Sequence, residues 1–307
     1  MTLAIHTEAL TKSYRNHTAL RNLDLRVESG TIFGLIGPNG AGKTTTLRLL
    51  LDIIRPTSGD ITVLGEHPRA AGPGLRRRIG YVPGELRLEG RVTGRALLNH
   101  LAQLSGTVAP GAINALAERL GLDLARPVRA LSKGNKQKLG LVQAFMHRPE
   151  LLVLDEPTSG LDPLVQREFL SMVREARDAG QTVLLSSHVL SEIQQAADYV
   201  AVLARGAIVA DGPVSSLRLA SIRRIRATLT STTAEAVLSS LQSVEGIRDV
   251  DVDDSAGELV RVSATVTGDI DPVIRAVAMA RIHDLTIEEP DLEESVLDLY
   301  ARTGDEK

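Results

Sequence analysis

Cysteine is absent from this chain of 307 residues. A disulfide framework, a thiolate metal site and a cysteine nucleophile are therefore excluded, and any metal must be held by oxygen or histidine ligands. Long apolar runs are absent as well, since no stretch approaches the roughly 18 consecutive apolar residues of a membrane-spanning helix. His6, Glu8 and Lys12 interrupt the apolar N-terminal stretch, which argues against a secretory signal. We therefore expect a cytoplasmic protein that needs a partner to move anything across a membrane.

The chain also lacks an excess of basic residues. Its 35 Lys and Arg residues face 38 Asp and Glu residues, which gives a formal net charge of -3. Such a chain offers no basic field that would attract nucleic acid or an anionic membrane, so we expect no nucleic-acid partner. A hydrophobic fraction of 43% is ordinary for a folded protein. The length allows one large domain and one smaller domain.

Short apolar runs recur along the chain and alternate with longer amphipathic stretches. The runs are residues 31–36, 151–155, 182–187 and 199–204, and residues 163–180 form one of the amphipathic stretches. This alternation predicts an α/β fold with a largely parallel central sheet.

Two regions depart from this alternation. Before Gly30, polar and apolar residues alternate as in strands with one solvated face, which predicts an antiparallel β layer ahead of the main sheet. Between about 86 and 149, leucines and alanines follow helical periods that are broken at Gly106, Pro110 and Gly121. We interpret this region as an inserted helical subdomain.

The composition shifts after residues 212–221. From Ile222 the tail is predicted to form strand, helix, strand, strand, helix and strand, followed by a closing helix near Asp291. A βαββαβ order is typical of a ferredoxin-like α+β domain. We therefore predict a main domain over residues 1–218 and an accessory domain over residues 219–307.

A phosphate-binding pattern, G-x4-G-K-[ST], lies between a predicted strand and a predicted helix. In such a loop the backbone N–H groups point at phosphate oxygens, and the helix N-terminus adds a favourable dipole. Lys43 would reach the β- and γ-phosphates, and Thr44 would give its hydroxyl to Mg²⁺. The alternative is a glycine-rich turn that ends in Lys-Thr by chance. The residues predicted to bind ATP here are Gly37, Pro38, Asn39, Gly40, Ala41, Gly42, Lys43, Thr44 and Thr45.

Two adjacent carboxylates, Asp155 and Glu156, end the apolar run Leu-Leu-Val-Leu-Asp-Glu. A phosphate-loop enzyme places its Mg²⁺ ligand at such a strand end. Asp155 would hold the metal or its water, which leaves Glu156 to orient and deprotonate the attacking water. The alternative is that both are solvated residues at a strand end, and the upstream phosphate loop argues against it.

With these motifs in order, the chain resembles the nucleotide-binding domain of ABC transporters over roughly residues 3–215. The resemblance implies a P-loop NTPase fold of the ABC type, with a mixed sheet core, an antiparallel β layer and a helical subdomain. It implies that Tyr14 stacks on adenine and that His188 contacts the γ-phosphate. Residues 131–135, Leu-Ser-Lys-Gly-Asn, resemble the signature motif, so Ser132 and Gly134 would bind phosphate. Residues 159–162 resemble the D-loop, which helps to form a dimer contact.

The chain departs from the family pattern at two places. Gly84 stands where the family has a glutamine that senses Mg²⁺, and we hypothesise that Glu85 substitutes for it as a metal ligand. In the signature motif, Lys133 replaces a glycine and Asn135 replaces the glutamine, while Ser132 stays intact. These changes, together with residues 289–300, resemble a branch that serves drug-resistance or polysaccharide-type permeases.

The resemblance implies an ATPase with ATP and Mg²⁺ as its cofactors. Because the signature loop of one subunit closes on the phosphate loop of another, it also implies a homodimer with ATP sandwiched between its subunits. The leading function is the energising subunit of an exporter of drugs or other amphipathic compounds, bound to a separate permease at the inner face of the cell membrane. The alternatives are a soluble ABC ATPase that acts on nucleic acid or ribosomes, and a nucleotide-gated regulator with little hydrolysis. Retention on nucleic acid at physiological salt would favour the first alternative.

Overall fold

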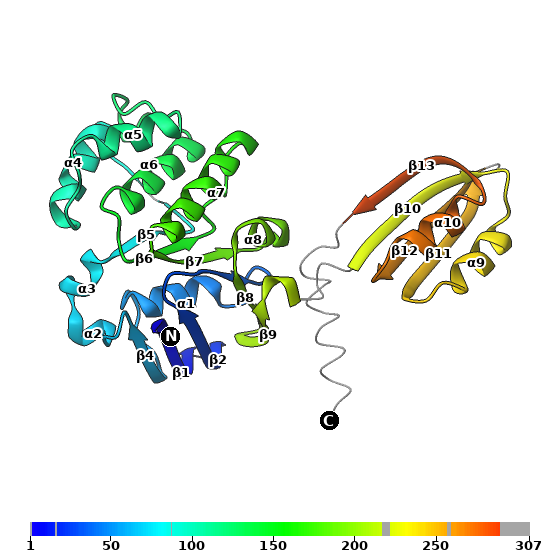
Figure 1. The fold of residues 1–307 in the computed structure, drawn as a ribbon, viewed down its shortest axis with the longest axis horizontal. Coiled ribbons are helices and arrows are strands. Elements are labelled where there is room, and N and C mark those ends of the chain that lie inside the picture. Colours follow the sequence, from blue (N-terminus) through cyan, green and yellow to red (C-terminus); the bar gives the residue numbers. More distant parts are fainter. Residues whose placement is uncertain (1, 16, 87, 217–221, 257–258, 289–307) are drawn as a thin grey trace. The chain divides into compact units, whose positions relative to one another are not determined.

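The computed structural model describes residues 2–15, 17–86, 88–216, 222–256 and 259–288. Within these ranges the strands form three sheets (Figure 1). The chain divides into two compact units, Met1–Ser215 and Ser216–Lys307. No helix in the described ranges combines the length and the apolar character that a membrane crossing requires. The closing helix predicted near Asp291, and with it the stretch 289–300, lies outside the described residues.

The central sheet of the first unit has six strands in the order β5-β6-β7-β3-β8-β9. All neighbours are parallel except β8 and β9. Every residue of β3 and β6 is buried because both faces of the sheet are covered. The predicted α/β core is thus confirmed, with an antiparallel strand at one edge. The strands are β3 (Ile32–Ile36), β5 (Ile79–Val82), β6 (Leu151–Asp155), β7 (Thr182–Ser187), β8 (Tyr199–Ala204) and β9 (Ala207–Pro213).

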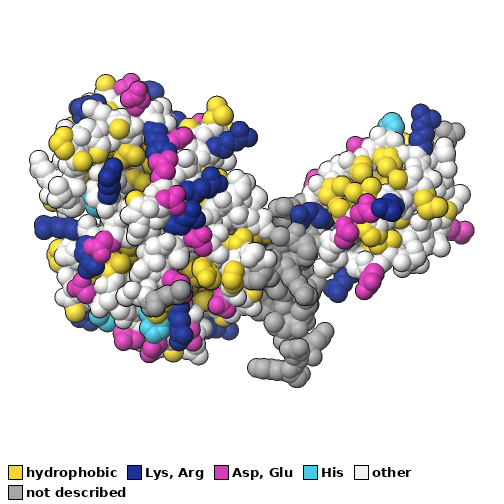
Figure 2. Space-filling model, viewed as in Figure 1, with side chains coloured by type: hydrophobic (Ala, Val, Ile, Leu, Met, Phe, Trp, Pro, Cys, Tyr) yellow, Lys and Arg dark blue, Asp and Glu magenta, His cyan; other side chains and the backbone are white. Residues whose placement is uncertain are grey.

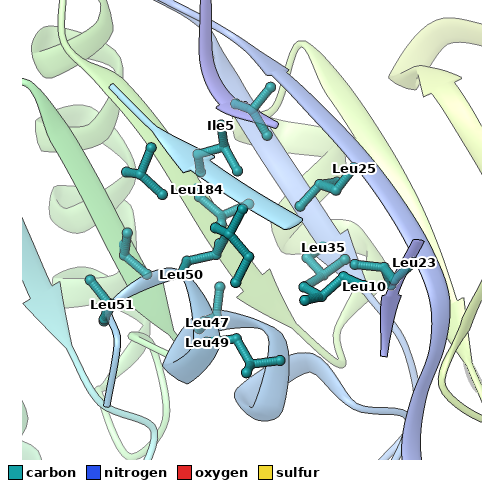
Figure 3. Packing of buried hydrophobic residues seen from close by; sticks show 14 of the residues in the cluster. Ile5, Leu10, Leu23, Leu25, Leu35, Leu47, Leu49, Leu50, Leu51 and Leu184 are labelled. Carbon is teal, nitrogen blue, oxygen red and sulfur yellow. The ribbon is translucent and has the colours of Figure 1, made fainter. Parts of the chain in front are cut away.

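An antiparallel layer of three strands, in the order β2-β1-β4, packs on the central sheet. Helix α1 (Lys43–Leu50) lies between the two layers, and its leucines join the strands in one core (Figure 3). The layer therefore fixes the position of the loop that precedes α1. Its strands are β1 (Leu3–Tyr14), β2 (His17–Glu28) and β4 (Ser58–Val63).

Three of the remaining helices fall between β5 and β6. Helices α4 (Gly94–Leu104), α5 (Ala112–Arg119) and α6 (Lys133–Phe145) are separated near the predicted breaks, and Gly121 follows α5 with a φ of 60°. Both α5 and α4 pack on α6, which in turn contacts β5. The other helices described before β10 are α2 (Pro68–Ala71), α3 (Pro73–Arg77), α7 (Pro163–Asp178) and α8 (Leu190–Ala196), with 3-10 turns at Val128–Ala130 and Val214–Ser216.

The second unit is a four-stranded antiparallel sheet in the order β11-β12-β10-β13. Two helices pack against one face and close a small core of aliphatic residues such as Leu229, Leu241 and Val266. Its chain order, strand-helix-strand-strand-helix-strand, is the βαββαβ order of the sequence prediction. The elements are β10 (Ile222–Thr230), α9 (Ala234–Gln242), β11 (Ile247–Ala256), β12 (Leu259–Thr267), α10 (Asp271–Val277) and β13 (Arg281–Glu288).

Charged side chains of both signs are interspersed over the surface shown in Figure 2. This mixture agrees with the small net charge of -3. A surface that binds nucleic acid through its phosphates gathers Lys and Arg on one face. The face in view has no such gathering among the described residues.

Candidate active site

The phosphate loop connects the buried strand β3 to helix α1 and includes two glycines that no other residue could replace without strain. A Cβ on Gly37 would lie 2.2 Å from the carbonyl oxygen of Leu203. Gly42 has a φ of 113°, and a Cβ there would lie 2.8 Å from the carbonyl oxygen of Ala19. Gly42 is also the N-cap of α1 and provides no side-chain cap. The first amides of α1 have no partners within the helix, so they are available to an anion.

Lys43 extends back along this loop. Its Nζ donates to the carbonyl oxygens of Gly37, at 2.5 Å, and of Pro38, at 3.3 Å. The same Nζ lies 3.3 Å from Oε1 of Glu156. Only 6% of the Lys43 side chain is exposed. A buried ammonium therefore connects the phosphate loop to the carboxylate that follows β6.

Asp155 ends β6 and is fully buried. Its Oδ1 accepts a hydrogen bond from the Ser186 hydroxyl at 2.7 Å. Its Oδ2 has no hydrogen-bond partner among the described residues, and a Cβ built on Gly84 would lie 3.1 Å from that atom. Burial and the nearby Asp155 carboxylate raise the pKa of the Tyr81 phenol above its ordinary value. One buried carboxylate oxygen thus points at the position where the chain has glycine.

Glu156 stands on a turned backbone with a φ of 48°, an uncommon conformation for a residue other than glycine. Its N–H donates to the carbonyl oxygen of Ser186 at 3.2 Å and to the hydroxyl of Ser186 at 3.1 Å. Its Oε2 lies 2.6 Å from Nδ1 of His188, which is half-exposed. Of the three residues predicted to be catalytic, Lys43 and His188 therefore each contact the third, Glu156.

A carboxylate that sequence reasoning missed supports this arrangement. Oε2 of Glu192, in the first turn of α8, accepts hydrogen bonds from the hydroxyls of Thr158 at 2.9 Å and Ser187 at 2.8 Å. Thr158 follows Glu156 by two residues, and Ser187 immediately precedes His188. Glu192 therefore joins the two segments that present Glu156 and His188. The sequence did contain a signal for Glu192, because this residue lies four positions after His188 and at the start of a helix.

A cavity of about 320 Å³ opens at the phosphate loop, which is within the usual range for small-molecule sites. It includes Tyr14, Thr45 and Glu156 as predicted, and also His17 and Ala19, which sequence reasoning missed. Tyr14 is 45% exposed, and the Lys12 ammonium lies 4.8 Å from its ring centroid. The cavity is lined by Tyr14, His17, Ala19, Pro38, Asn39, Gly40, Ala41, Gly42, Lys43, Thr44, Thr45 and Glu156. A larger cavity of about 480 Å³, near His6 and Asp211, contains none of these residues.

Six predicted site residues do not line this cavity. Gly37, Asp155 and His188 are next in sequence to a lining residue or in contact with one, whereas Ser132, Gly134 and Glu85 belong to other segments. Ser132 is the N-cap of α6, where its Oγ accepts a hydrogen bond from the N–H of Asn135 at 3.2 Å. Gly134 lies in the first turn of α6, where a Cβ would come within 2.6 Å of the Gly160 carbonyl oxygen. Glu85 is exposed and stands next to Gly84, the residue that lies against Asp155. Among the predicted residues, the structure brings together those of the phosphate loop, the two carboxylates, His188 and Tyr14.

Comparison with known proteins gives one consistent family. The family described as ABC transporter matches residues 20–159. The bacitracin transport ATP-binding protein BcrA of Bacillus licheniformis is 38% identical over 221 residues, which cover 71% of this chain and 72% of that protein. The daunorubicin resistance ATP-binding protein DrrA3 of Streptomyces coeruleorubidus is 35% identical over 315 residues, which cover 99% of this chain and 97% of that protein.

Solved structures show the same fold. The structure of an ATP-binding subunit of an ABC transporter matches with a TM-score of 0.66 and 30% identity, over 71% of this chain and 92% of that one. A dimeric ATP-binding cassette, MJ0796, in a post-hydrolysis state bound to ADP and Pi, matches with a TM-score of 0.63 and 19% identity, over 69% of this chain and 100% of that one. The second likeness concerns the fold alone.

Proposed function

Because the chain belongs to the ABC transporter family, we propose that it is the ATP-hydrolysing subunit of an exporter and powers a separate membrane permease. The observation that supports hydrolysis best is the contact of Lys43, Glu156 and His188 beside the phosphate loop. The relatives named for bacitracin transport and daunorubicin resistance support a cargo of drugs or other amphipathic compounds. Through the permease, the chain works at the inner face of the cell membrane.

Glu156 acts as the general base. Its carboxylate follows directly after the buried Asp155, in a turn that holds it between the Lys43 ammonium and the His188 ring. A carboxylate in this place can orient a water and take its proton while the water attacks the γ-phosphate. Lys43 neutralises charge on the phosphates, and His188 fixes the carboxylate and contacts the γ-phosphate. Lys43 and His188 thus act by position and charge, as phosphoryl transfer requires, while Glu156 also takes a proton.

The residues around Asp155 fit a magnesium ion. Mg²⁺ in phosphate-loop enzymes is held by one or two protein oxygens together with phosphate and water. Asp155 supplies a buried Oδ2 with no hydrogen-bond partner among the described residues, and Thr44 supplies a hydroxyl at the start of α1. When bound, Mg²⁺ neutralises charge on the transferring phosphoryl group. Glu85 is proposed as an additional ligand.

The active unit is a homodimer with ATP between its subunits. Ser132 and Gly134 are at the N-terminus of α6 and do not line the cavity beside Lys43 in their own chain. Helix N-termini bind anions, so these residues are suited to the phosphates bound by a second copy. Tyr14 in the cavity wall stacks on the adenine ring. The alternatives of a regulator or a nucleic-acid ATPase find no support in the named relatives.

Transport by a reconstituted pair tests this proposal. The chain would be purified together with a membrane protein that binds it and inserted into vesicles, and ATP-driven movement of a fluorescent amphipathic drug would be measured. We expect drug movement that requires ATP and disappears with Glu156→Gln. Normal hydrolysis by a chain that binds no membrane protein and moves no drug would contradict the exporter function.

A further inference from the structure

The N-terminus of α6 is clamped to the turn that follows Glu156. Gln137, one turn into α6, donates from Nε2 to the carbonyl oxygen of Pro157 at 3.0 Å. The Gln137 side chain is buried, with 4% of its surface exposed, and Pro157 is buried as well. A buried carbonyl that loses its donor is costly, because water cannot replace the bond. The hydrogen bond therefore fixes the Pro157–Thr158 peptide unit, one residue beyond the catalytic base.

Two further contacts join the same segments. The Lys133 ammonium lies 3.2 Å from Oγ of Ser159, and the stem of Lys133 packs over Gly160. A Cβ on Gly134 would lie 2.6 Å from the carbonyl oxygen of Gly160, so glycine permits this close approach. The segment 132–137 and the turn 157–160 thus form one packed unit. A shift of one of them must displace the other.

We infer that Gln137 is a positioning residue for Glu156, and that it links the two ATP sites of the dimer. This inference rests on the proposed function, in which the 132–134 segment serves the nucleotide of the partner subunit. Engagement of this segment by that nucleotide moves or fixes the N-terminus of α6. Through its hydrogen bond, Gln137 transmits the position of this helix end to Pro157, and so to the carboxylate of Glu156, the residue before Pro157. Each chain then sets its own base according to the nucleotide that its partner holds.

The geometry of Glu156 makes it sensitive to this contact. Its backbone has a φ of 48°, and its carboxylate must stay beside the phosphate loop, where it contacts Lys43 and His188. A conformation of this kind persists only when surrounding contacts hold it. Loss of the Gln137 hydrogen bond would relax the turn and misplace the base. A misplacement of about 1 Å lowers the rate of an enzyme by up to roughly 100-fold.

Gln137→Met removes the donor and keeps the length of the side chain. We expect about a 10- to 100-fold loss of kcat, with ATP affinity unchanged and a weaker dependence of turnover on binding of the second ATP. Gln166→Met is the matched control. Gln166, in α7, also donates its side-chain amide to a backbone carbonyl, that of Leu161 at 3.2 Å, which lies just beyond the turn 157–160. Gln137→His, whose ring N–H has a similar reach, should recover much of the rate. Equal effects of the two methionine variants would overturn the inference.

Mixed dimers show in which chain Gln137 acts. One dimer pairs a wild-type chain with a chain that has both Gln137→Met and Glu156→Gln, and the other has the two changes on opposite chains. If Gln137 positions the base of its own chain, the first dimer keeps one intact site and is the more active. The reverse order would show that Gln137 serves the partner's nucleotide and would overturn the inference. If Glu156→Gln chains form no dimer with ATP, the proposed function fails first, so the two failures can be told apart.

Discussion

Replacement of Glu156 by glutamine tests the central assignment of the site. The change keeps the shape of the side chain and removes its charge and its ability to accept a proton. A positioned general base contributes roughly 10²- to 10⁴-fold to a rate, which corresponds to about 3 to 5 kcal/mol of transition-state stabilisation. We expect hydrolysis to fall by this factor, measured as phosphate release at saturating Mg-ATP.

The same substitution should not weaken ATP binding. Lys43 and Glu156 approach to 3.3 Å, and their Coulomb attraction is on the order of 5 kcal/mol at an effective dielectric constant of about 20, before the cost of desolvation. In Glu156→Gln no carboxylate competes with the phosphates of ATP for the Lys43 ammonium, so the phosphates can bind this ammonium without displacing a charged partner. The variant should therefore bind ATP at least as tightly and accumulate as a dimer in size-exclusion chromatography with Mg-ATP.

The control is Glu150→Gln, just before β6, because Glu150 is an exposed carboxylate that pairs with Arg78. Its substitution should leave hydrolysis unchanged. A Glu156→Gln protein that hydrolyses ATP at the wild-type rate would refute the assignment of the base. If Glu156→Gln is inactive but remains monomeric with ATP, the assignment of Glu156 as the base would stand and the ATP-linked dimer would be refuted.

Three more predictions concern phosphate, metal and pH. Lys43→Ala should weaken ATP binding by roughly 10- to 100-fold in a fluorescent-nucleotide titration, because a charged hydrogen bond to phosphate is lost, and unchanged binding would count against the phosphate loop. Glu85→Ala should raise the Mg²⁺ concentration for half-maximal ATPase activity of the isolated chain without lowering metal-free nucleotide affinity, whereas an unchanged titration with transport lost would assign Glu85 to permease coupling. Burial lowers the pKa of His147 below its ordinary 6.5, so below that pH the unfolded chain takes up a proton that the folded chain resists, and stability falls as the pH falls. Measured by urea unfolding, the free energy of unfolding should fall less between pH 7.5 and pH 5.5 for His147→Gln than for the wild type. An equal fall in both proteins would show that His147 is not the cause.

Local patterns were enough to predict the main elements of this fold. The run at 151–155 is the strand β6, and the run at 182–187 is β7, with the bounds that the apolar residues indicated. Such segments are predictable because burial on both faces demands an unbroken apolar sequence. The phosphate loop was predictable from the spacing of its motif, although the atoms that exclude a Cβ at Gly37 and Gly42 belong to the distant residues Leu203 and Ala19. The strand pattern and the motif can both be read within a few positions along the chain.

Contacts between distant segments were not predictable in this way. His17 lines the cavity because β1 and β2 form a hairpin in which Tyr14 pairs with His17, and no motif marks that residue. Glu192 and Gln137 are ordinary polar residues of helices, where most such side chains face solvent. Packing against the turn after Glu156 gives Gln137 its partner, and packing against that turn and the end of β7 gives Glu192 its two partners. Both contacts depend on the whole sheet order.

On the proposed assignment of Glu156 as the general base, the position of Lys43 would join ATP binding and the release of that base in one event. The ammonium is shared by two loop carbonyl oxygens and the Glu156 carboxylate, and its three donors are therefore in use. A γ-phosphate that takes this ammonium must displace at least one of those oxygens. A carboxylate carries the largest charge among them, and a phosphate beside it would repel it. The phosphate therefore frees Glu156 from Lys43 and leaves it with His188, 2.6 Å away, as its remaining partner. On this proposal the base becomes available only when the phosphate that its water attacks is in place.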